Sequence, residues 1–231
     1  MYHQHFDQIP STQTYLKSHL AELQKNHSNI LVSCDQQTEG HGRNNKIWND
    51  SEGSVAFSFT LPTNDKPTLI PLFIALKVID FFKAQNQLVL NVKWPNDLYY
   101  LNKKCGGIIC QQIDQTIVVG IGLNLMDVPS TITDGNNQVG HLNLSKIEDF
   151  KKSLPSKIYS HILQSAFDVF EIQNQFQENA LYLNQIVTLH EDNQTEEGVF
   201  LGIGDIGEAI IKKDNGSLIK FYNGTLRNKN T

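Results

Sequence analysis

The sequence predicts a domain of mixed helices and strands followed by a small β-barrel. Helical periodicity and strand alternation both occur up to about residue 182, whereas only short strand-like runs follow. The 231 residues suffice for one sizeable core and a small appended domain. We therefore predict two domains, at residues 1–182 and 183–231.

A helix is the first element that we predict, in the segment PSTQTYLKSHLAELQK. Leu16, Leu20 and Leu23 recur at helical spacing, and Ser11 or Thr12 can cap the N-terminus. The segment NILVSC then has the composition of a short buried strand. SVAFSFTL alternates large apolar side chains with smaller ones, which is typical of a half-buried strand.

A long helix and three further strands come next. LIPLFIALKVIDFFKAQ repeats large apolar side chains about once per turn, which predicts a helix with one packed face. LVLNVKW, CGGIICQQI and TIVVGIGLNL are separated by turn signals, so we expect a meander of adjacent strands. Helical periodicity returns in SKIYSHILQSAFDVFEIQNQF, where Pro155 stands at the expected start.

Short strand-like runs fill the chain from about Gln185. They are IVTLHED, EGVFLGIG, EAIIKKDNGSLIKF and GTLR, and the Asn215-Gly216 pair in the third is a hairpin signal. A small β-barrel is the simplest fold for these runs.

Composition limits the functions that the chain can have. Its hydrophobic content is 39%, and its formal net charge of -5 argues against broad binding to nucleic acid or anionic membranes. Any polyanion that it handles is therefore expected to be small. No apolar run approaches the roughly 20 residues of a membrane span, and the N-terminus lacks the pattern of a signal peptide, so we expect a cytoplasmic protein.

Cysteine and histidine patterns predict no metal centre. Cys34, Cys105 and Cys110 make an odd count with no CxxC spacing, so we expect small buried side chains rather than disulfides or a zinc site. His3 and His5 are spaced like metal ligands, but we expect them to belong to a frayed terminus.

The stretch TEGHGRNNKIW raises the first question of function. Gly40 and Gly42 are compatible with a hairpin loop that needs positive φ, or with a cradle for phosphate. A dinucleotide fingerprint is excluded because Asn45 stands where a third glycine is required, and no P-loop string occurs in the chain.

The same stretch carries side chains that suit a phosphate-and-base site. Arg43 and Lys46 can meet an anion, and the Trp48 indole can stack on a base. We also expect the glycine-rich backbone to offer N–H groups to the anion.

A second group of such residues lies in VKWPNDLYYLNKKCGG. Pro95 is expected to end a strand at a tight Asn-Asp turn that fixes the direction of Asp97. Lys104 is followed by Gly106 and Gly107, which leave room for a ligand against the strand. Taken alone, these residues favour a well-made turn and solvated surface lysines over a binding site.

Together these motifs resemble the biotin protein ligase family, in its short form without an N-terminal DNA-binding domain. The matching strings are PSTQTYL, DQQTEGHGRNNKIW, VKWPNDLYYLNKKCGGII and VVGIGLNL, with a weaker match at NGTLR. The resemblance implies an α+β fold: a mixed, largely antiparallel sheet flanked by helices, similar to class II aminoacyl-tRNA synthetase cores, followed by an SH3-like barrel.

The resemblance also implies a reaction. Biotin and MgATP would form biotinyl-5'-AMP, from which biotin passes to a lysine of the biotin carboxyl carrier protein of acetyl-CoA carboxylase. It implies catalytic roles for Arg43, Lys104 and Asp97, with Gln37 at the ureido ring and Trp48 beside the adenine.

The binding residues that the resemblance implies fall into two sets. Those for biotin are Ser11, Thr12, Gln13, Gln37, Gly40, His41, Gly42, Arg43, Lys104, Gly106 and Gly107. Those for the nucleotide are Arg43, Lys46, Trp48, Lys93, Asn124 and Arg227.

Several positions depart from the family pattern. His41, Asn44 and Asn45 stand in place of two arginines and a glycine of the usual Gly-Arg-Gly-Arg-Arg-Gly loop, which reduces the loop's charge. This change bears on how firmly the loop retains the adenylate and on dimer contacts. Pro10 and Gln111 replace usual acidic residues, and we infer no role for them.

Two alternatives stay open beside a biotin ligase. Lipoate ligases share the fold and the two-step reaction, although the KWPND and GxGxN strings favour biotin. A biotin-responsive DNA repressor is the alternative from another class, but only ten residues precede Ser11, which we judge too few for a helix-turn-helix domain. Both monomer and homodimer are compatible with the sequence.

Overall fold

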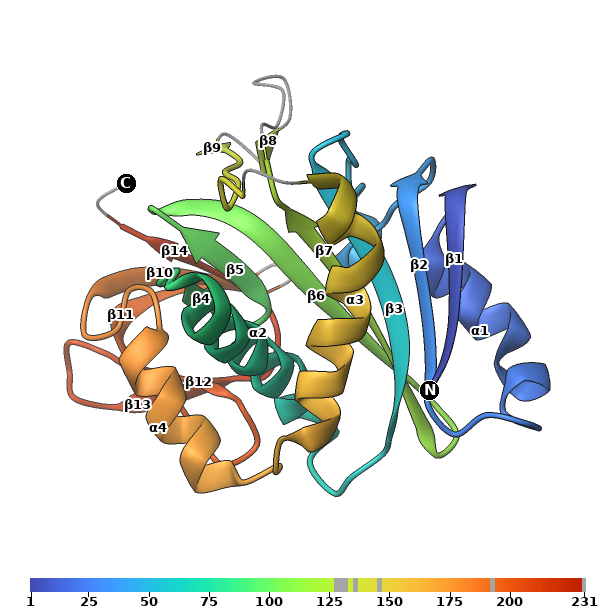
Figure 1. Cartoon of the computed structure of the whole chain (residues 1–231). Coiled ribbons are helices and arrows are strands. Elements are labelled where there is room, and N and C mark those ends of the chain that lie inside the picture. Colours follow the sequence, from blue (N-terminus) through green and yellow to red (C-terminus); the bar gives the residue numbers. More distant parts are fainter. Residues whose placement is uncertain (127–132, 135–136, 145–146, 192–193, 230–231) are drawn as a thin grey trace. The chain divides into compact units, whose positions relative to one another are not determined.

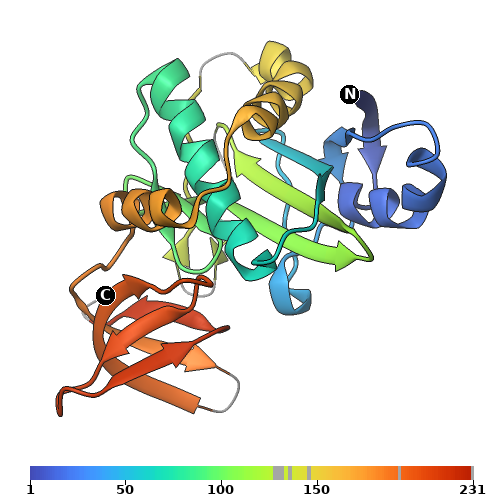
Figure 2. The same cartoon turned by 90° about the horizontal axis from the view of Figure 1, so that it is seen from below.

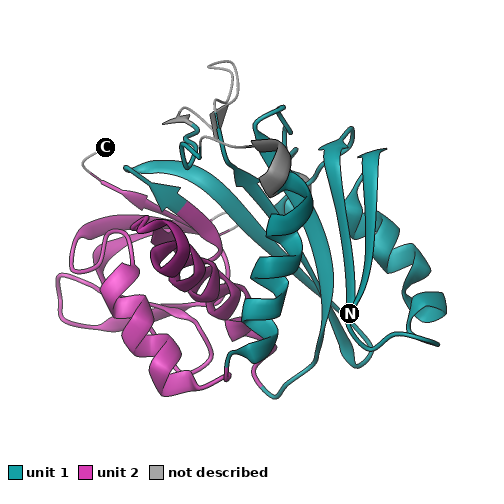
Figure 3. Cartoon of the chain, in the orientation of Figure 1, with its two compact units in different colours: residues 1–65, 99–165 teal, residues 66–98, 166–231 magenta. Residues whose placement is uncertain are grey.

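The computed structural model of the chain describes residues 1–126, 133–134, 137–144, 147–191 and 194–229 (Figure 1). The chain forms two compact units (Figure 3). Unit 1 contains Met1–Asp65 and Tyr99–Ser165, and unit 2 contains Lys66–Leu98 and Ala166–Thr231. The predicted division into domains at residue 183 stays a proposal.

Unit 1 is built on a mixed sheet. Strand β1 is parallel to β2, and the pairs β2–β3, β3–β7 and β7–β6 are antiparallel, as the family resemblance predicts. The small ribbon β8–β9 is also antiparallel. The strands are β1 (Tyr2–Ile9), β2 (Ile30–Gln37), β3 (Ser54–Pro62), β6 (Lys103–Ile113), β7 (Thr116–Asn124), β8 (Thr133–Asp134) and β9 (Asn137–Gln138).

The N-terminus is a strand, so the expected frayed end is wrong. Gln4 pairs with Val32 and Phe6 with Cys34, in register along β2. Single-sequence reasoning missed this strand because polar side chains interrupt its apolar ones and its stability comes from pairing with a distant segment.

Helix α1 (Thr12–Leu23) covers one face of this sheet. Ser11 is its N-cap, since the Ser11 Oγ accepts a hydrogen bond from the Thr14 backbone N–H at 3.3 Å. Leu16 and Leu20 pack against buried side chains of the sheet, namely Ile30, Val32 and Val118.

Replacing Leu16 with alanine is expected to lower the free energy of unfolding by about 2–5 kcal/mol. The side chain is fully buried in this cluster, so its loss leaves a cavity. Leu101, which is 76% exposed, provides the matched control, and its alanine variant should change stability by less than about 0.5 kcal/mol. Urea unfolding followed by circular dichroism would measure both. A Leu16→Ala variant as stable as wild type would contradict this account of the core.

Helix α3 (Ile147–Gln164) covers the opposite face, where the Tyr159 ring stacks on Phe59 with centroids 4.5 Å apart. It begins before the predicted start, so Pro155 lies inside the helix. The sequence predicted one helix here, but the structure has two. Asp168 caps the second, α4 (Val169–Asn179), by accepting a hydrogen bond from the Glu171 N–H at 2.8 Å. Capping thus overrides the apolar periodicity.

Unit 2 contains helices α2 (Ile70–Asn86) and α4 and a five-stranded antiparallel sheet, coloured orange to red in Figure 2. The strand order β13-β12-β11-β10-β14 supports the predicted C-terminal β-structure. The Asn215-Gly216 hairpin is confirmed, with Gly216 at φ 83. The strands are β10 (Ile186–Glu191), β11 (Gln194–Ile203), β12 (Ala209–Lys212), β13 (Leu218–Phe221) and β14 (Thr225–Asn228).

Unit 2 also holds β4 (Asn91–Lys93), and β5 (Asp97–Tyr100) begins in it and continues into unit 1. The turn between them spans Trp94 to Asn96, so Asp97 begins β5 rather than lying in the turn. In the described part of the chain, no helix has the length and apolar character needed to cross a membrane.

Candidate active site

A strip of glycines forms the floor of the candidate site. Gly107 of β6 pairs with Gly122 of β7, and Gly120 lies two residues further along the same face. On the next strand, Ser58 pairs with Gly120. We call Gly107, Gly120 and Gly122 the glycine strip. The missing side chains let other groups pack directly on this backbone, since a Cβ on Gly120 would lie only 2.9 Å from Cγ1 of Ile109.

Gly106 and Lys104 precede Gly107 on strand β6. Gly106 pairs with Leu123, so it belongs to the other face of the sheet, and a contact from Gly106 to a ligand would have to use its backbone. Lys104 is partly buried near the start of β6, and its carbonyl accepts a hydrogen bond from the Gly140 N–H at 2.7 Å.

The segment from Gly40 to Trp48 closes on itself as a small hairpin. The Trp48 N–H donates to the Gly40 carbonyl at 2.9 Å, and the Gly42 N–H donates to the Lys46 carbonyl at 2.7 Å. Arg43 lies in the short 3-10 turn at its tip. These N–H groups are therefore occupied inside the hairpin, and the side chains of Arg43 and Lys46 remain as the loop's positive groups.

Steric approach, rather than positive φ, explains the glycine at position 40. Gly42 has φ -110, and Gly40 also lies outside the positive-φ region, so the hairpin hypothesis that requires positive φ is wrong. A Cβ on Gly40 would lie 2.6 Å from the Trp48 carbonyl oxygen. Only glycine allows the two arms of the hairpin to approach this closely.

The Trp48 indole lies directly on the glycine strip. A Cβ on Gly122 would lie 2.5 Å from Cε2 of the indole, so the ring edge rests against the backbone of β7. The indole Nε1–H donates to Asp50 Oδ1 at 2.7 Å. The ring is therefore held from two sides.

Asp50 is a site residue that the sequence analysis missed. Its second oxygen, Oδ2, accepts a hydrogen bond from the Gln37 backbone N–H at 2.7 Å. Burial raises the pKa of this carboxyl, and the bonds from Gln37 and Trp48 oppose that shift. The only signal in the sequence was a carboxylate two residues after the tryptophan of a cationic loop.

The predicted biotin-side residues form a hydrogen-bonded group next to the strip. Gln37 Oε1 accepts from the Thr12 backbone N–H at 2.9 Å and from Thr12 Oγ1 at 3.1 Å. Thr12 Oγ1 also lies 2.9 Å from Ser58 Oγ. The Nε2 amide of Gln37 carries the donors that this group can present to a ligand carbonyl.

Ser11 and Gln13 support this group from helix α1. Both side chains are buried, Ser11 as the helix cap and Gln13 with its Nε2 donating to the Val118 carbonyl at 3.4 Å. Asn124 is buried in a similar way: it accepts from Ser54 Oγ and donates to the Gly140 carbonyl, both at 3.1 Å. One further N–H of the Asn124 amide can meet another acceptor.

Three predicted site residues belong to unit 2. Lys93 is buried at the end of β4, Asp97 begins β5, and Arg227 is exposed on β14. Next to Lys93, the Trp94 indole is buried and its Nε1–H donates to the Gly207 carbonyl at 2.9 Å. This bond fixes the start of the turn that leads to Asp97.

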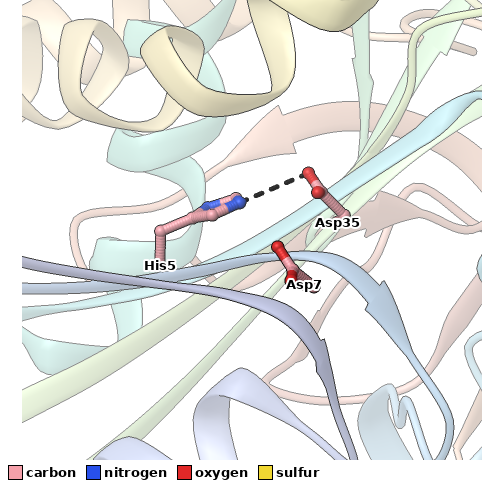
Figure 4. A group of neighbouring side chains, drawn as sticks. All are labelled: His5, Asp7 and Asp35. Atoms are coloured by element: carbon pink, nitrogen blue, oxygen red, sulfur yellow. Dashed lines mark ion pairs between the residues drawn. The ribbon is translucent and has the colours of Figure 1, made fainter.

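A separate group with metal-ligating atoms consists of His5, Asp7 and Asp35 (Figure 4). His5 Nε2 lies 3.3 Å from Asp35 Oδ1, and Asp7 is exposed. Lys151 donates to the Asp35 carbonyl at 3.1 Å and adds positive charge beside the group. Cys34 pairs with Ala56 of β3, which pairs with Gly122, so the Cys34 side chain is on the face of the glycine strip. The next residue, Asp35, therefore points to the opposite face of the sheet.

Comparisons with known proteins agree with one another. The profile of the Biotin/lipoate A/B protein ligase family matches residues 5–125. Biotin--protein ligase 2 of Arabidopsis thaliana is 27% identical over 93% of this chain and 75% of its own length. The bifunctional ligase/repressor BirA of Bacillus spizizenii is 26% identical over 85% of this chain and 65% of its own length.

Among solved structures, the biotin protein ligase from Aquifex aeolicus in complex with biotin and ATP superimposes with a TM-score of 0.81. The match covers 99% of both chains at 24% sequence identity. At this identity the likeness concerns the fold.

Proposed function

This chain belongs to the Biotin/lipoate A/B protein ligase family, and on that premise we propose that it activates biotin with ATP and transfers it to a lysine of a carrier protein. The observation that carries the proposal is that two kinds of group lie side by side at the glycine strip. Thr12 and Gln37 form a polar group suited to the ureido ring, and the Trp48 indole offers a stacking surface for adenine.

The reaction needs no nucleophile from the protein. An oxygen of the biotin carboxylate attacks the α-phosphorus of ATP, the bond to pyrophosphate breaks, and biotinyl-5'-AMP forms. The neutral amine of the acceptor lysine then attacks the acyl carbon, and AMP leaves as the amide forms. Mg²⁺ arrives with ATP and neutralises charge on the phosphates.

Charge repulsion is the main local obstacle in the first step, because two anions must meet. A unit positive charge ~4 Å from a unit negative charge stabilises it by roughly 4 kcal/mol at an effective dielectric of ~20. Lys104 and Arg43 are the residues that we propose for this task, with Lys104 near the biotin carboxylate and Arg43 over the adenylate. Lys46, Lys93, Asn124 and Arg227 are proposed nucleotide contacts.

Alignment of the two substrates also accelerates the reaction, since well-oriented reactants reach effective molarities of ~10⁵–10⁸ M. Thr12 and Gln37 are proposed to orient the ring, with Ser11, Gln13, Gly40, His41, Gly42, Gly106 and Gly107 completing the biotin pocket. In the second step we propose that Asp97 accepts a hydrogen bond from the acceptor amine and so directs it.

Mass spectrometry of a carboxyl-carrier domain tests this function. The domain is incubated with the protein, MgATP and biotin, and the proposal expects one added biotinyl group. A parallel incubation with lipoate tests the second candidate, which the family's description includes. Modification by lipoate and not by biotin would reassign the substrate, and modification by neither would refute an acyl-transfer function.

The proposed partner is the biotin carboxyl carrier protein of acetyl-CoA carboxylase, with the chain acting as monomer or homodimer. The cysteines Cys34, Cys105 and Cys110 are free, and the first two are buried, which suits a reducing compartment such as the cytoplasm. The formal net charge of -5 favours neither nucleic acid nor an anionic membrane as a partner. A gel shift with biotin-operon promoter DNA would test the repressor alternative.

Replacing Arg43 with glycine is expected to release more free biotinyl-5'-AMP. Arg43 lies at the tip of the loop, so its loss removes a charge from the proposed cover of the adenylate while the hairpin bonds of Gly42 and Trp48 remain. Chromatography of the filtrate after incubation with biotin and MgATP would measure the released adenylate. Equal release by wild type and variant would contradict this role for Arg43.

A further inference from the structure

We propose that Asp50 is a positioning residue that holds the Trp48 indole on the glycine strip and ties it to the end of strand β2. This inference rests on the proposed function, because it assigns Asp50 to the nucleotide side of that site. Both carboxylate oxygens are engaged, Oδ1 by the Trp48 Nε1–H and Oδ2 by the Gln37 backbone N–H, each at 2.7 Å. One side chain therefore joins two segments of the site.

The chemistry of the two partners requires a carboxylate. Both partners are N–H donors, so the side chain between them must present an acceptor in each direction. An asparagine amide has one acceptor and would turn its own donors toward the other N–H. Hydrogen bonds to an ionised group are also about twice as strong as neutral ones. Aspartate thus accepts from both N–H donors at position 50, whereas asparagine, its nearest isostere, accepts from only one.

The glycine strip limits the indole from the other side. Cε2 and Cζ2 of the ring lie 2.5 and 2.6 Å from the place of a Cβ on Gly122, so the ring is packed closely against the backbone of β7. The bond to Asp50 resists movement away from it. Together the two contacts define a single position for the surface proposed to stack on adenine.

Gln37 extends this arrangement to the biotin side. Its backbone donates to Asp50, and its side-chain oxygen accepts twice from Thr12. The residue proposed to read the ureido ring is therefore bonded to the residue that places the indole. We expect a change at Asp50 to weaken the binding of both substrates, and not of ATP alone.

Fluorescence of the ligand-free protein gives the first test. The chain has two tryptophans, so subtracting the emission of Trp48→Phe from that of wild type isolates Trp48. Asp50→Asn should shift this emission to the red and increase its quenching by acrylamide, and Asp50→Glu, which keeps both acceptor oxygens, should recover part of the wild-type behaviour. Asp114→Asn is the matched control, because Asp114 is exposed in the β6–β7 turn at φ 51, a conformation that asparagine tolerates.

Steady-state kinetics give the second test. Asp50→Asn should raise KM for ATP and for biotin by about tenfold each, which corresponds to one lost charge-assisted hydrogen bond, with a smaller change in kcat. In the Trp48→Phe background the effect of Asp50→Asn on KM for ATP should shrink, because the indole N–H is already absent. Equal effects in both backgrounds would overturn the proposal, and so would wild-type emission and quenching in Asp50→Asn.

The two tests separate this inference from the proposed function. The quenching experiment contains no substrate, so it can support or overturn the Asp50 contact even if the protein activates neither biotin nor lipoate. Thermal unfolding of each variant shows whether it is folded. Should Asp50→Asn not fold, quenching in Asp50→Glu decides: wild-type or mildly increased quenching supports the contact, and quenching equal to that of free indole overturns it.

Discussion

Replacing Lys104 with alanine is expected to slow biotinyl-5'-AMP formation by up to three powers of ten while ATP binding changes little. The estimate follows from a unit charge at ~4 Å from a developing anion, worth roughly 4 kcal/mol at an effective dielectric of ~20. In the proposed site the charge of Lys104 acts where the two anions meet, so its loss is expected to raise the barrier more than it weakens the ground state. Biotin-dependent exchange of labelled pyrophosphate into ATP measures this step.

A distant exposed lysine provides the matched control for this experiment. Lys25 is exposed just after helix α1, at the end of the helix opposite Ser11, so Lys25→Ala removes an equal charge away from the candidate site. Its exchange rate should stay within about threefold of wild type, in line with the weakness of screened surface charges. Near-normal exchange in Lys104→Ala would refute the proposed role, and equal losses in both variants would indicate a general effect of net charge.

Much of this fold was predictable because local signals and tertiary packing agree in its central elements. Helix α1 shows this agreement: the leucines that recur at helical spacing are those that pack on the sheet, and Ser11 caps the helix as predicted. Strand β1 shows the opposite case, since it has little apolar alternation and depends on pairing with β2. Pro155 misled the prediction of α3 because proline favours a helix start but does not exclude a position inside a packed helix.

Only part of the candidate site could be predicted from the sequence. Chemically distinctive residues such as Gln37 and Trp48 stand out in the sequence, and they meet in unit 1. Asp50 does not stand out, because its function depends on two donors that only the folded loop and β2 bring to its oxygens. The distinction between Gly106 and Gly107 likewise depends on strand register, since a shift of one residue exchanges the two faces.

Replacing Gly122 with alanine is expected to lower kcat/KM for adenylate formation by about 30–150-fold. The added Cβ would lie 2.5–2.6 Å from two indole carbons, closer than such atoms approach, so the Trp48 ring must leave the strip. Displacement of the ring also stretches its bond to Asp50, and overpacking together with one lost hydrogen bond amounts to about 2–3 kcal/mol. Pyrophosphate exchange at varied ATP measures the loss.

The size of the aromatic ring decides whether this explanation holds. In the Trp48→Phe background the phenyl ring is shorter and carries no N–H group, so Gly122→Ala should cost much less there than in wild type. A loss of the same size in both backgrounds would mean that the methyl group obstructs the substrate directly. Unchanged kinetics in wild type would instead mean that the indole swings aside freely, and that the strip and the Asp50 contact do not hold it. The comparison therefore measures how much of the activity depends on a fixed indole.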